Sequence, residues 1–211
     1  MTLSTRLFAT ALLALACTGW PARAALTADR EPHALIESVT EQTLAAIERH
    51  RDSFTQNPQP FFDDINRILG DNADIPGIAK GVMGKYYRLA TEEQRAAFAE
   101  VFQRSLIETY AKALMGFDNE KIVVLPPQGP SREPNTATVN MEVYSDSGNV
   151  YPVSYSLFLD DQGHWKLKNV IVNGINLGLT FRNQFATALR QSRDIDRVIQ
   201  EWQPVVDEPA T

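Results

Sequence analysis

The sequence predicts an α+β fold, with a curved antiparallel sheet of about four strands covered by several helices. Helical periodicity dominates residues 32–116, and apolar residues alternate with polar ones over residues 136–172. A second helical pattern begins at Leu177. Helices first, antiparallel strands afterwards and a closing helix are typical of α+β domains. We expect an apolar cavity between sheet and helices, although dense packing is the usual state of such a space.

Apolar stripes and capping residues mark the helices. The first covers residues 32–51, and a short one covers residues 61–69 after a break that contains Pro58 and Pro60. Asp74 is placed to cap a third helix. Thr91 and Gln94 form a capping box at the head of the longest helix, which is expected to end near residue 116.

The strands are expected at residues 122–125, 136–144, 150–159 and 165–172. Residues 146–149 and 160–163 are rich in Asp, Ser, Asn and Gly, which favour turns. Asn173 and Gly174 predict a further turn into a helix that carries Leu177 and Phe181. A last short helix is expected near residues 194–202.

Residues 1–24 have the pattern of a cleavable signal peptide. Arg6 precedes an apolar run at residues 7–17, and Ala22-Arg23-Ala24 fits a cleavage site. Two alternatives remain, a disordered amphipathic N-terminus and a lipoprotein leader that ends at Cys17. Residues 25–203 then have the length of one domain, and residues 204–211 are expected to form a flexible tail.

Composition excludes several functional classes. The chain carries a net charge of −6, which disfavours nucleic acid as a partner and lasting adhesion to anionic membranes. Cys17 is the only cysteine and lies in the leader, so the mature domain has neither a disulfide framework nor a thiolate nucleophile. A monomeric, exported domain without these devices is expected.

The search for catalytic residues gives a largely negative result. His33, His50 and His164 have no metal-ligand spacing, and no nucleophile elbow, phosphate loop or dinucleotide motif is present. The acidic pairs at residues 63–64 and 160–161 are expected to be solvated rather than to act as acid and base. We therefore expect no enzyme, no metal and no cofactor.

Two ordered blocks carry a family resemblance. Residues 78–114 contain a glycine, an aromatic pair and the patterns T-x-x-Q-R-x-x-F and T-Y-x-x-x-L, at Gly84, Tyr86, Tyr87, Thr91, Gln94, Arg95, Phe98, Thr109, Tyr110 and Leu114. The second block matches at Trp165, Leu167, Gly174, Ile175, Leu177, Phe181, Arg182, Gln184 and Phe185. Together they resemble the MlaC family, also called the toluene-tolerance family, over nearly all of the chain after the leader. Asn169 and Asn176 depart from the family pattern, in which many members carry Asp and Ser there.

The resemblance implies a periplasmic phospholipid carrier with a fold similar to NTF2-like cones. Phospholipid is then the cargo, with buried acyl chains and an exposed headgroup. The implied partners are an inner-membrane ABC transporter complex, met through its MCE-domain subunit, and an outer-membrane lipoprotein–porin complex. The pathway maintains outer-membrane lipid asymmetry.

Periodicity then predicts which residues form the wall of the lipid pocket. The predicted wall residues are Ile78, Val82, Phe102, Leu106 and Tyr110 on helices and Val139, Met141, Val143, Val153, Tyr155 and Leu157 on strands. Arg182 is expected either to brace its helix or to lie at the pocket mouth.

Two other functions stay open at this point. An isomerase or dehydratase of the same fold would need an Asp or His with a shifted pKa inside the cone. The inward strand positions predicted here are Val, Met, Tyr and Leu, which disfavours that reading. A periplasmic interaction module with a solid core is the other alternative, because the same aromatic residues form an ordinary core equally well.

Overall fold

The computed structural model has the α+β architecture that the sequence predicts. It describes residues 31–116, 121–129, 131, 133–145 and 148–205, so the expected leader, the start of the turn at residue 146 and residues 206–211 lie outside the described residues. The helices are α2 (Glu31–His50), α3 (Gln59–Asn72), α4 (Ile75–Met83), the 3-10 helix η1 (Gly84–Arg88), α5 (Glu92–Met115), α6 (Leu177–Ser192) and α7 (Ile195–Gln200). The strands are β1 (Lys121–Val124), β2 (Thr136–Tyr144), β3 (Val150–Leu159), β4 (Trp165–Val172) and β5 (Ile175–Asn176).

The sheet is antiparallel throughout, in the order β1-β2-β3-β4-β5. Four strands match the expected ones, and β5 adds a short fifth. It arises because Asn173 and Gly174 both have positive φ, of 48° and 80°, which turns the chain back onto β4. On the inner face Met141 lies opposite Val153, and Val139 lies opposite Tyr155.

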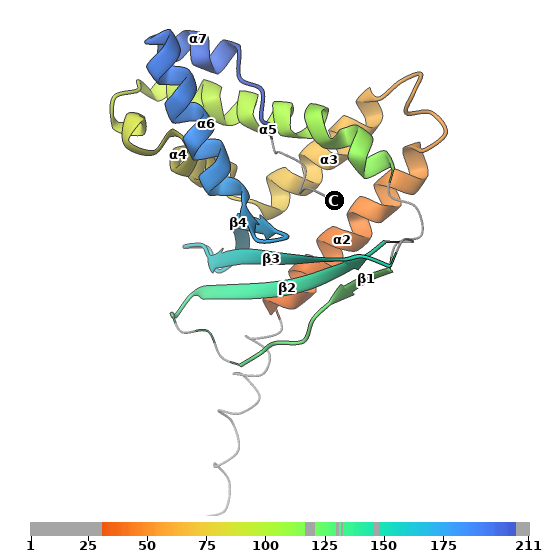
Figure 1. Ribbon diagram of the computed structural model, residues 1–211. Helices are drawn as coiled ribbons and strands as arrows, with labels where there is room; N and C mark the ends of the chain where they lie inside the picture. The colour runs from red at the N-terminus through yellow and green to blue at the C-terminus, as the bar shows by residue number, and fades with distance from the viewer. Residues whose placement is uncertain (1–30, 117–120, 130, 132, 146–147, 206–211) are drawn as a thin grey trace, which may run out of the picture.

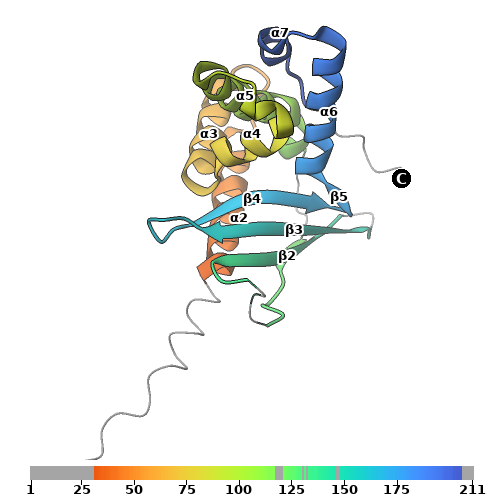
Figure 2. The same cartoon turned by 90° about the vertical axis from the view of Figure 1, so that its left-hand side faces the viewer.

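The helices form two groups around this sheet. Helix α2 crosses one face and contacts β1, β2 and β4, whereas α3 to α7 gather beyond the β4 edge (Figures 1 and 2). No helix in the part of the chain that the structure describes is both long enough and apolar enough to cross a membrane.

The main core belongs to the second group of helices, and we call it the helical core. Phe98, Phe102 and Phe185 are completely or almost completely buried there, and their rings contact Trp202. The Phe98 and Phe185 ring centroids are 4.8 Å apart in an edge-to-face arrangement, which aromatic pairs prefer. Aliphatic residues of α4 and α7 join these aromatic rings in one core that includes no residue of the sheet.

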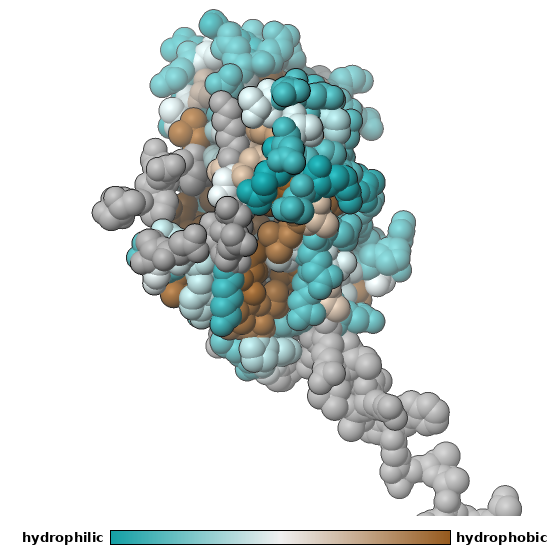
Figure 3. Space-filling model, turned by 90° about the vertical axis from the view of Figure 1, so that its right-hand side faces the viewer, coloured by the Kyte–Doolittle hydropathy of each residue, from teal (hydrophilic) through white to brown (hydrophobic). Residues whose placement is uncertain are grey.

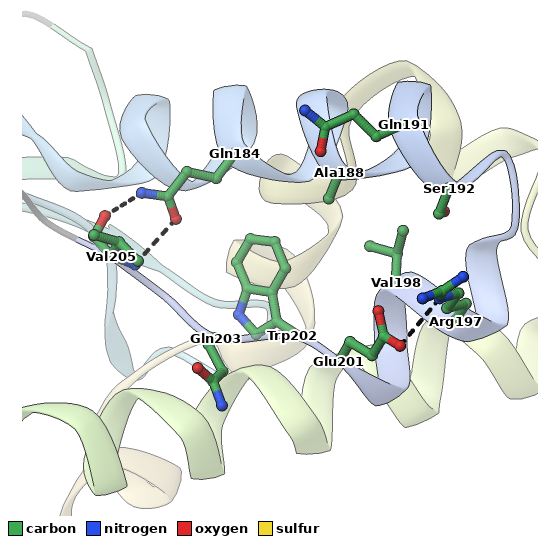
Figure 4. A pocket seen from close by; sticks show the side chains of 10 residues that line it. All are labelled: Gln184, Ala188, Gln191, Ser192, Arg197, Val198, Glu201, Trp202, Gln203 and Val205. Atoms are coloured by element: carbon green, nitrogen blue, oxygen red, sulfur yellow. Dashed lines mark hydrogen bonds and ion pairs between the residues drawn. The ribbon is translucent and has the colours of Figure 1, made fainter.

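The C-terminal segment packs against α6 beyond the last helix. Pro204 is buried, and both backbone polar groups of Val205 hydrogen-bond to the side chain of Gln184 (Figure 4). These contacts border a groove of about 470 Å³ between α6 and α7. The first two residues of the expected tail are therefore attached to the domain.

Local capping signals are present as expected. The side chain of Asp74 accepts a hydrogen bond from Gly77 N at 3.0 Å and begins α4. At the head of α5, Thr91 N donates to Gln94 Oε1 at 3.0 Å and Gln94 N donates to Thr91 Oγ1 at 3.2 Å. This reciprocal pair is the capping box, which satisfies two backbone donors that the helix itself leaves unpaired.

Replacing Thr91 by alanine should lower the free energy of unfolding by about 1 kcal/mol, because the N-cap acceptor is lost. Urea denaturation followed by circular dichroism measures this difference. Thr109, exposed on the same helix, is the matched control, and Thr109→Ala should cause no loss of stability and should raise it slightly, because alanine is the better helix former. Equal losses from the two substitutions would contradict the assigned role of Thr91.

Candidate functional site

A cavity of about 900 Å³ lies between α2 and the inner face of the sheet. One side of the cavity comes from α2 and the end of α5, and the other side comes from β1 to β4. The lining residues are Val39, Thr40, Thr43, Leu44, Ile47, Leu114, Ile122, Met141, Val143, Asn149, Val150, Tyr151, Val153, Tyr155, Val170, Val172 and Asn173. The sequence did not decide whether the space between sheet and helices is filled, and between α2 and the sheet it is hollow.

The cavity opens to solvent beside the β2–β3 hairpin. Leu44 on α2 and Val150 at the start of β3 both line the cavity and are 40% and 45% exposed, which is high for large aliphatic residues. Figure 3 views the molecule from this side and shows apolar surface set back between polar residues. An apolar interior with an exposed aliphatic rim can admit an elongated apolar ligand from outside.

The α2 side of the wall is apolar because its two threonine hydroxyls are bonded within the helix. On α2, Thr40 Oγ1 donates to Ile36 O at 2.7 Å and Thr43 Oγ1 donates to Val39 O at 2.8 Å. These hydroxyls bond their own helix and leave methyl groups to line the space. No residue among the described lining residues carries a charge, and burial raises the pKa of Tyr155 to about 12, so its phenol stays neutral.

Two periodicities bring these residues together. Val39, Thr43 and Ile47 recur every four residues and therefore share one face of α2. On β2 and β3, alternate residues point to the same face of the sheet, which places Met141 and Val153 toward α2. A helix stripe and a strand stripe thus form the two sides of the cavity.

The structure brings four of the predicted wall residues to this cavity, namely Met141, Val143, Val153 and Tyr155. Val139 and Leu157 lie on the same sheet face but farther along, where they pack with Ile36 in a separate group. We call Ile36, Val139 and Leu157 the closed cluster, because their exposed fractions are only 3%, 0% and 0%. They do not line the cavity.

The helical residues of the predicted wall lie elsewhere. Ile78, Val82, Phe102 and Leu106 belong to or pack against the helical core, and Tyr110 is half-buried on α5 outside the cavity lining. Helix α2 takes their place as the helical wall. Its apolar stripe is visible in the sequence, but the stripe does not tell which helix crosses the sheet.

The acidic pair at residues 63–64 does not behave as expected, because Asp64 is not simply solvated. His50 Nε2 lies 2.9 Å from Asp64 Oδ2, and the guanidinium groups of Arg49 and Arg67 pair with the same carboxylate. These partners lower the pKa of Asp64, mainly through the hydrogen bond from His50, against a partial burial that raises it. The cluster joins α2 to α3 and is structural.

The Asp64 cluster predicts a stability difference that depends on pH. A lowered folded pKa stabilises the fold above the ordinary value of 3.8, and this stabilisation is lost as the pH falls below it. Asp64→Asn should therefore lower stability at neutral pH and make acid unfolding below about pH 4 less steep. Unfolding curves from neutral to acidic pH measure both effects. Asp63→Asn, at the exposed neighbour, should keep the wild-type profile, and identical profiles for all three proteins would contradict the prediction.

His164 and Asp160 belong to the turn between β3 and β4. His164 is exposed, as expected, and the carboxylate of Asp160 accepts hydrogen bonds from Gln162 N and His164 N within its turn. Asp160 is therefore a turn residue rather than a freely solvated one. Within the described ranges, no three His, Cys, Asp or Glu side chains come together as metal ligands.

Arg182 lies on the helical side of the molecule, outside the cavity lining. Its guanidinium covers Gly84, where an added Cβ would come within 2.7 Å of Arg182 Nε. Gly84 also has a φ of +55°, a conformation that favours glycine. Of the two roles expected for Arg182, bracing its helix against the junction of α4 and η1 fits this position.

The two asparagines that depart from the family pattern both serve the start of α6. Asn176 is its N-cap and accepts from Leu179 N at 3.0 Å. Asn169, on β4, accepts from Gly178 N at 3.2 Å. Both side chains supply the acceptor oxygen that a helix N-terminus needs, so neither departure removes the cap.

Comparison with known proteins agrees with this architecture. The model of the MlaC protein family matches residues 37–204, which include the whole cavity lining. The chain belongs to the MlaC family. This assignment confirms the resemblance carried by the two sequence blocks.

Relatives of known name extend the comparison. The toluene tolerance protein ttg2D of Pseudomonas putida is 41% identical over 177 residues, covering 83% of this chain and 81% of the relative. MlaC of Haemophilus influenzae is named an intermembrane phospholipid transport system binding protein. It is 21% identical over 185 residues, which cover 86% of this chain and 85% of the relative. A solved phospholipid-binding protein of Ralstonia solanacearum, in complex with a phospholipid, has a TM-score of 0.70 at 24% identity, covering 79% of this chain and 92% of that one. This last likeness shows the common fold.

Proposed function

We propose that this MlaC-family protein is a soluble periplasmic carrier that holds the acyl chains of phospholipids in the cavity between α2 and the sheet. The observation that carries the proposal is the cavity itself, whose described lining is uncharged and whose rim exposes Leu44 and Val150. The headgroup remains at the mouth. The names of relatives that bind or transport phospholipid support the same cargo.

The size of the cavity suits such a cargo. A methylene group is close in size to a water molecule, whose share of liquid volume is about 30 Å³. The cavity of about 900 Å³ therefore has room for the hydrocarbon of about two acyl chains. Small apolar metabolites would leave most of this volume empty.

The energetics of hydrocarbon burial explain why an apolar cavity suits transport between membranes. The two chains of a phospholipid contain about 30 methylenes, and exposing them to water costs roughly 24 kcal/mol at about 0.8 kcal/mol each. A bilayer and the cavity both avoid that cost. Transfer between them is therefore nearly neutral, and contacts with partners can drive it in either direction.

Tail recognition should dominate over headgroup recognition. The described lining contains no Lys or Arg to pair with a phosphate, and the polar residues among its lining are Asn149, Asn173, two threonines and two tyrosines. We propose that headgroups of different chemistry are accepted.

The proposed partners are an inner-membrane ABC transporter complex with an MCE-domain subunit and an outer-membrane lipoprotein–porin complex. The signal-peptide pattern of residues 1–24 supports a periplasmic location.

Lipid extraction tests the proposal directly. The mature protein is purified without detergent, extracted with organic solvent, and the extract is analysed by mass spectrometry. Near-stoichiometric phospholipid is expected. A clean extract that stays clean after incubation with phospholipid vesicles would contradict the carrier function and favour an interaction module that binds no lipid.

A further inference from the structure

The inner end of the cavity is formed by one aromatic residue that touches two separate apolar groups. Tyr155 packs against the cavity-lining group of Met141, Val143 and Val153, and also against the closed cluster. Its strand partners are Val139 on β2 and Val170 on β4. Of these two, Val170 lines the cavity and Val139 does not. The cavity therefore ends at the row of the sheet that contains Tyr155.

Met141 links the Tyr155 side chain to β2 and, through a second contact, to α2. The Tyr155 hydroxyl lies 4.0 Å from the sulfur of Met141 on β2. Thr40 Oγ1, on α2, lies 3.9 Å from the same sulfur. Three side chains from α2, β2 and β3 thus meet at one sulfur atom, at the row of the sheet where the cavity lining ends. We call Thr40, Met141 and Tyr155 the cavity floor.

Behind the floor, the closed cluster occupies the same inner face of the sheet. Leu157 follows Tyr155 on that face of β3, and Ile36 lies one helical turn before Thr40 on α2. The closed cluster that they form with Val139 is almost completely inaccessible. A chain that enters from the mouth can advance along α2 only as far as the floor.

We propose that Tyr155 sets the maximum length of acyl chain that the cavity encloses. The inference rests on the proposed function and adds a rule of specificity to it. A chain longer than the cavity leaves its surplus methylenes in water at the mouth. Each such methylene lowers affinity about fourfold relative to a bilayer, where it would stay buried. Among the floor residues, Tyr155 has the largest side chain, so its truncation should lengthen the cavity most.

Competitive loading tests this rule. Delipidated protein is incubated with vesicles that contain an equimolar mixture of saturated phosphatidylglycerols of graded chain length, and the bound species are quantified by mass spectrometry. The wild type should show an upper limit of chain length. Tyr155→Ala should move this limit upward, with the ratio of the longest to the shortest bound species rising at least tenfold, equivalent to about two further sheltered methylenes.

Two further variants separate length selection from general damage. Tyr155→Phe keeps the ring and should keep the wild-type limit, because the ring occupies the space. Phe158→Ala removes an aromatic ring from the same strand, outside the cavity lining, and should also keep that limit. Tyr155→Leu, a milder truncation, should give an intermediate shift if Tyr155→Ala folds poorly.

The outcomes distinguish this inference from the proposed function. A wild-type protein that takes up no phospholipid of any length would overturn both. Normal uptake with the same chain-length distribution in Tyr155→Ala and the wild type would overturn the length rule alone and leave the carrier function in place. An equal shift in Tyr155→Ala and Phe158→Ala would also overturn the rule, because the second ring does not line the cavity.

Discussion

Val153→Asp should reduce the lipid that co-purifies with the protein by at least a hundredfold. Val153 is 8% exposed, lies on β3 and faces the cavity. Water reaches this position only in part even in the empty cavity, so the carboxylate lowers stability, and lipid binding carries a further cost because it must remove the remaining water. Burying an unpaired carboxyl costs several kcal/mol, and about 3 kcal/mol already corresponds to a hundredfold change in affinity. Because transfer from a bilayer is nearly neutral, this cost is enough to empty the carrier.

Ser154 offers a matched control on the same strand. Adjacent strand residues point to opposite faces, and Ser154 lies outside the cavity lining. Ser154→Asp should leave lipid content unchanged. Leu44→Asp, at the partly exposed rim, tests the same idea with less risk to folding and should also reduce loading. Mass spectrometry of solvent extracts measures all three, with circular dichroism to establish folding. Wild-type lipid content in folded Val153→Asp would contradict the location of the binding site.

Phe98→Ala should cause a large loss of stability without changing what the protein carries. Phe98 is fully buried in the helical core and contacts the rings of Phe102, Phe185 and Trp202. Removing such a ring typically costs about 3 to 5 kcal/mol, which is a large part of the total stability of a domain. The cavity shares no residue with this core, so lipid content per folded molecule should remain at the wild-type level.

Guanidinium unfolding and lipid analysis on the folded fraction measure the two quantities separately. Phe98→Leu is the milder variant for the case that alanine prevents folding, and it should show a smaller loss of stability with the same lipid content. Phe158→Ala, at a half-buried ring, should destabilise much less. A fall in lipid content that follows the loss of stability in each variant would contradict the separation of core and cavity.

Local pattern was enough to predict most elements of the fold. The alternation of Met141 and Val143 on β2, and of Val153 and Tyr155 on β3, gave the correct inward face, because the period of a strand leaves only two choices. The caps at Asp74 and Thr91 were equally predictable, since each depends on neighbours three residues away. The short β5 was missed because a two-residue strand has no periodicity to detect.

The site itself was predicted only on its sheet side. Which helix crosses the sheet is decided by packing between distant segments, and α2, α4 and α5 each carry apolar residues at helical spacing in the sequence. The boundary between hollow and filled space was also invisible, because Val139 and Met141 are equivalent in pattern and differ only in what lies opposite them. The partners of Asp64 were missed for the same reason, since two of them come from the preceding helix.

The hydrogen bonds from the threonine hydroxyls of α2 to the backbone of the same helix affect how fast a bound lipid leaves. Because Thr40 and Thr43 donate to their own helix, α2 presents methyl groups to the cavity, and a hydrocarbon chain there makes only non-directional contacts with this wall. Such a chain is free to slide, and the barrier to its departure comes from the water outside rather than from bonds within. A bound lipid should therefore stay in the cavity for a long time while the protein is surrounded by water. It should leave quickly when the mouth contacts an apolar acceptor, so delivery requires physical contact with the receiving surface.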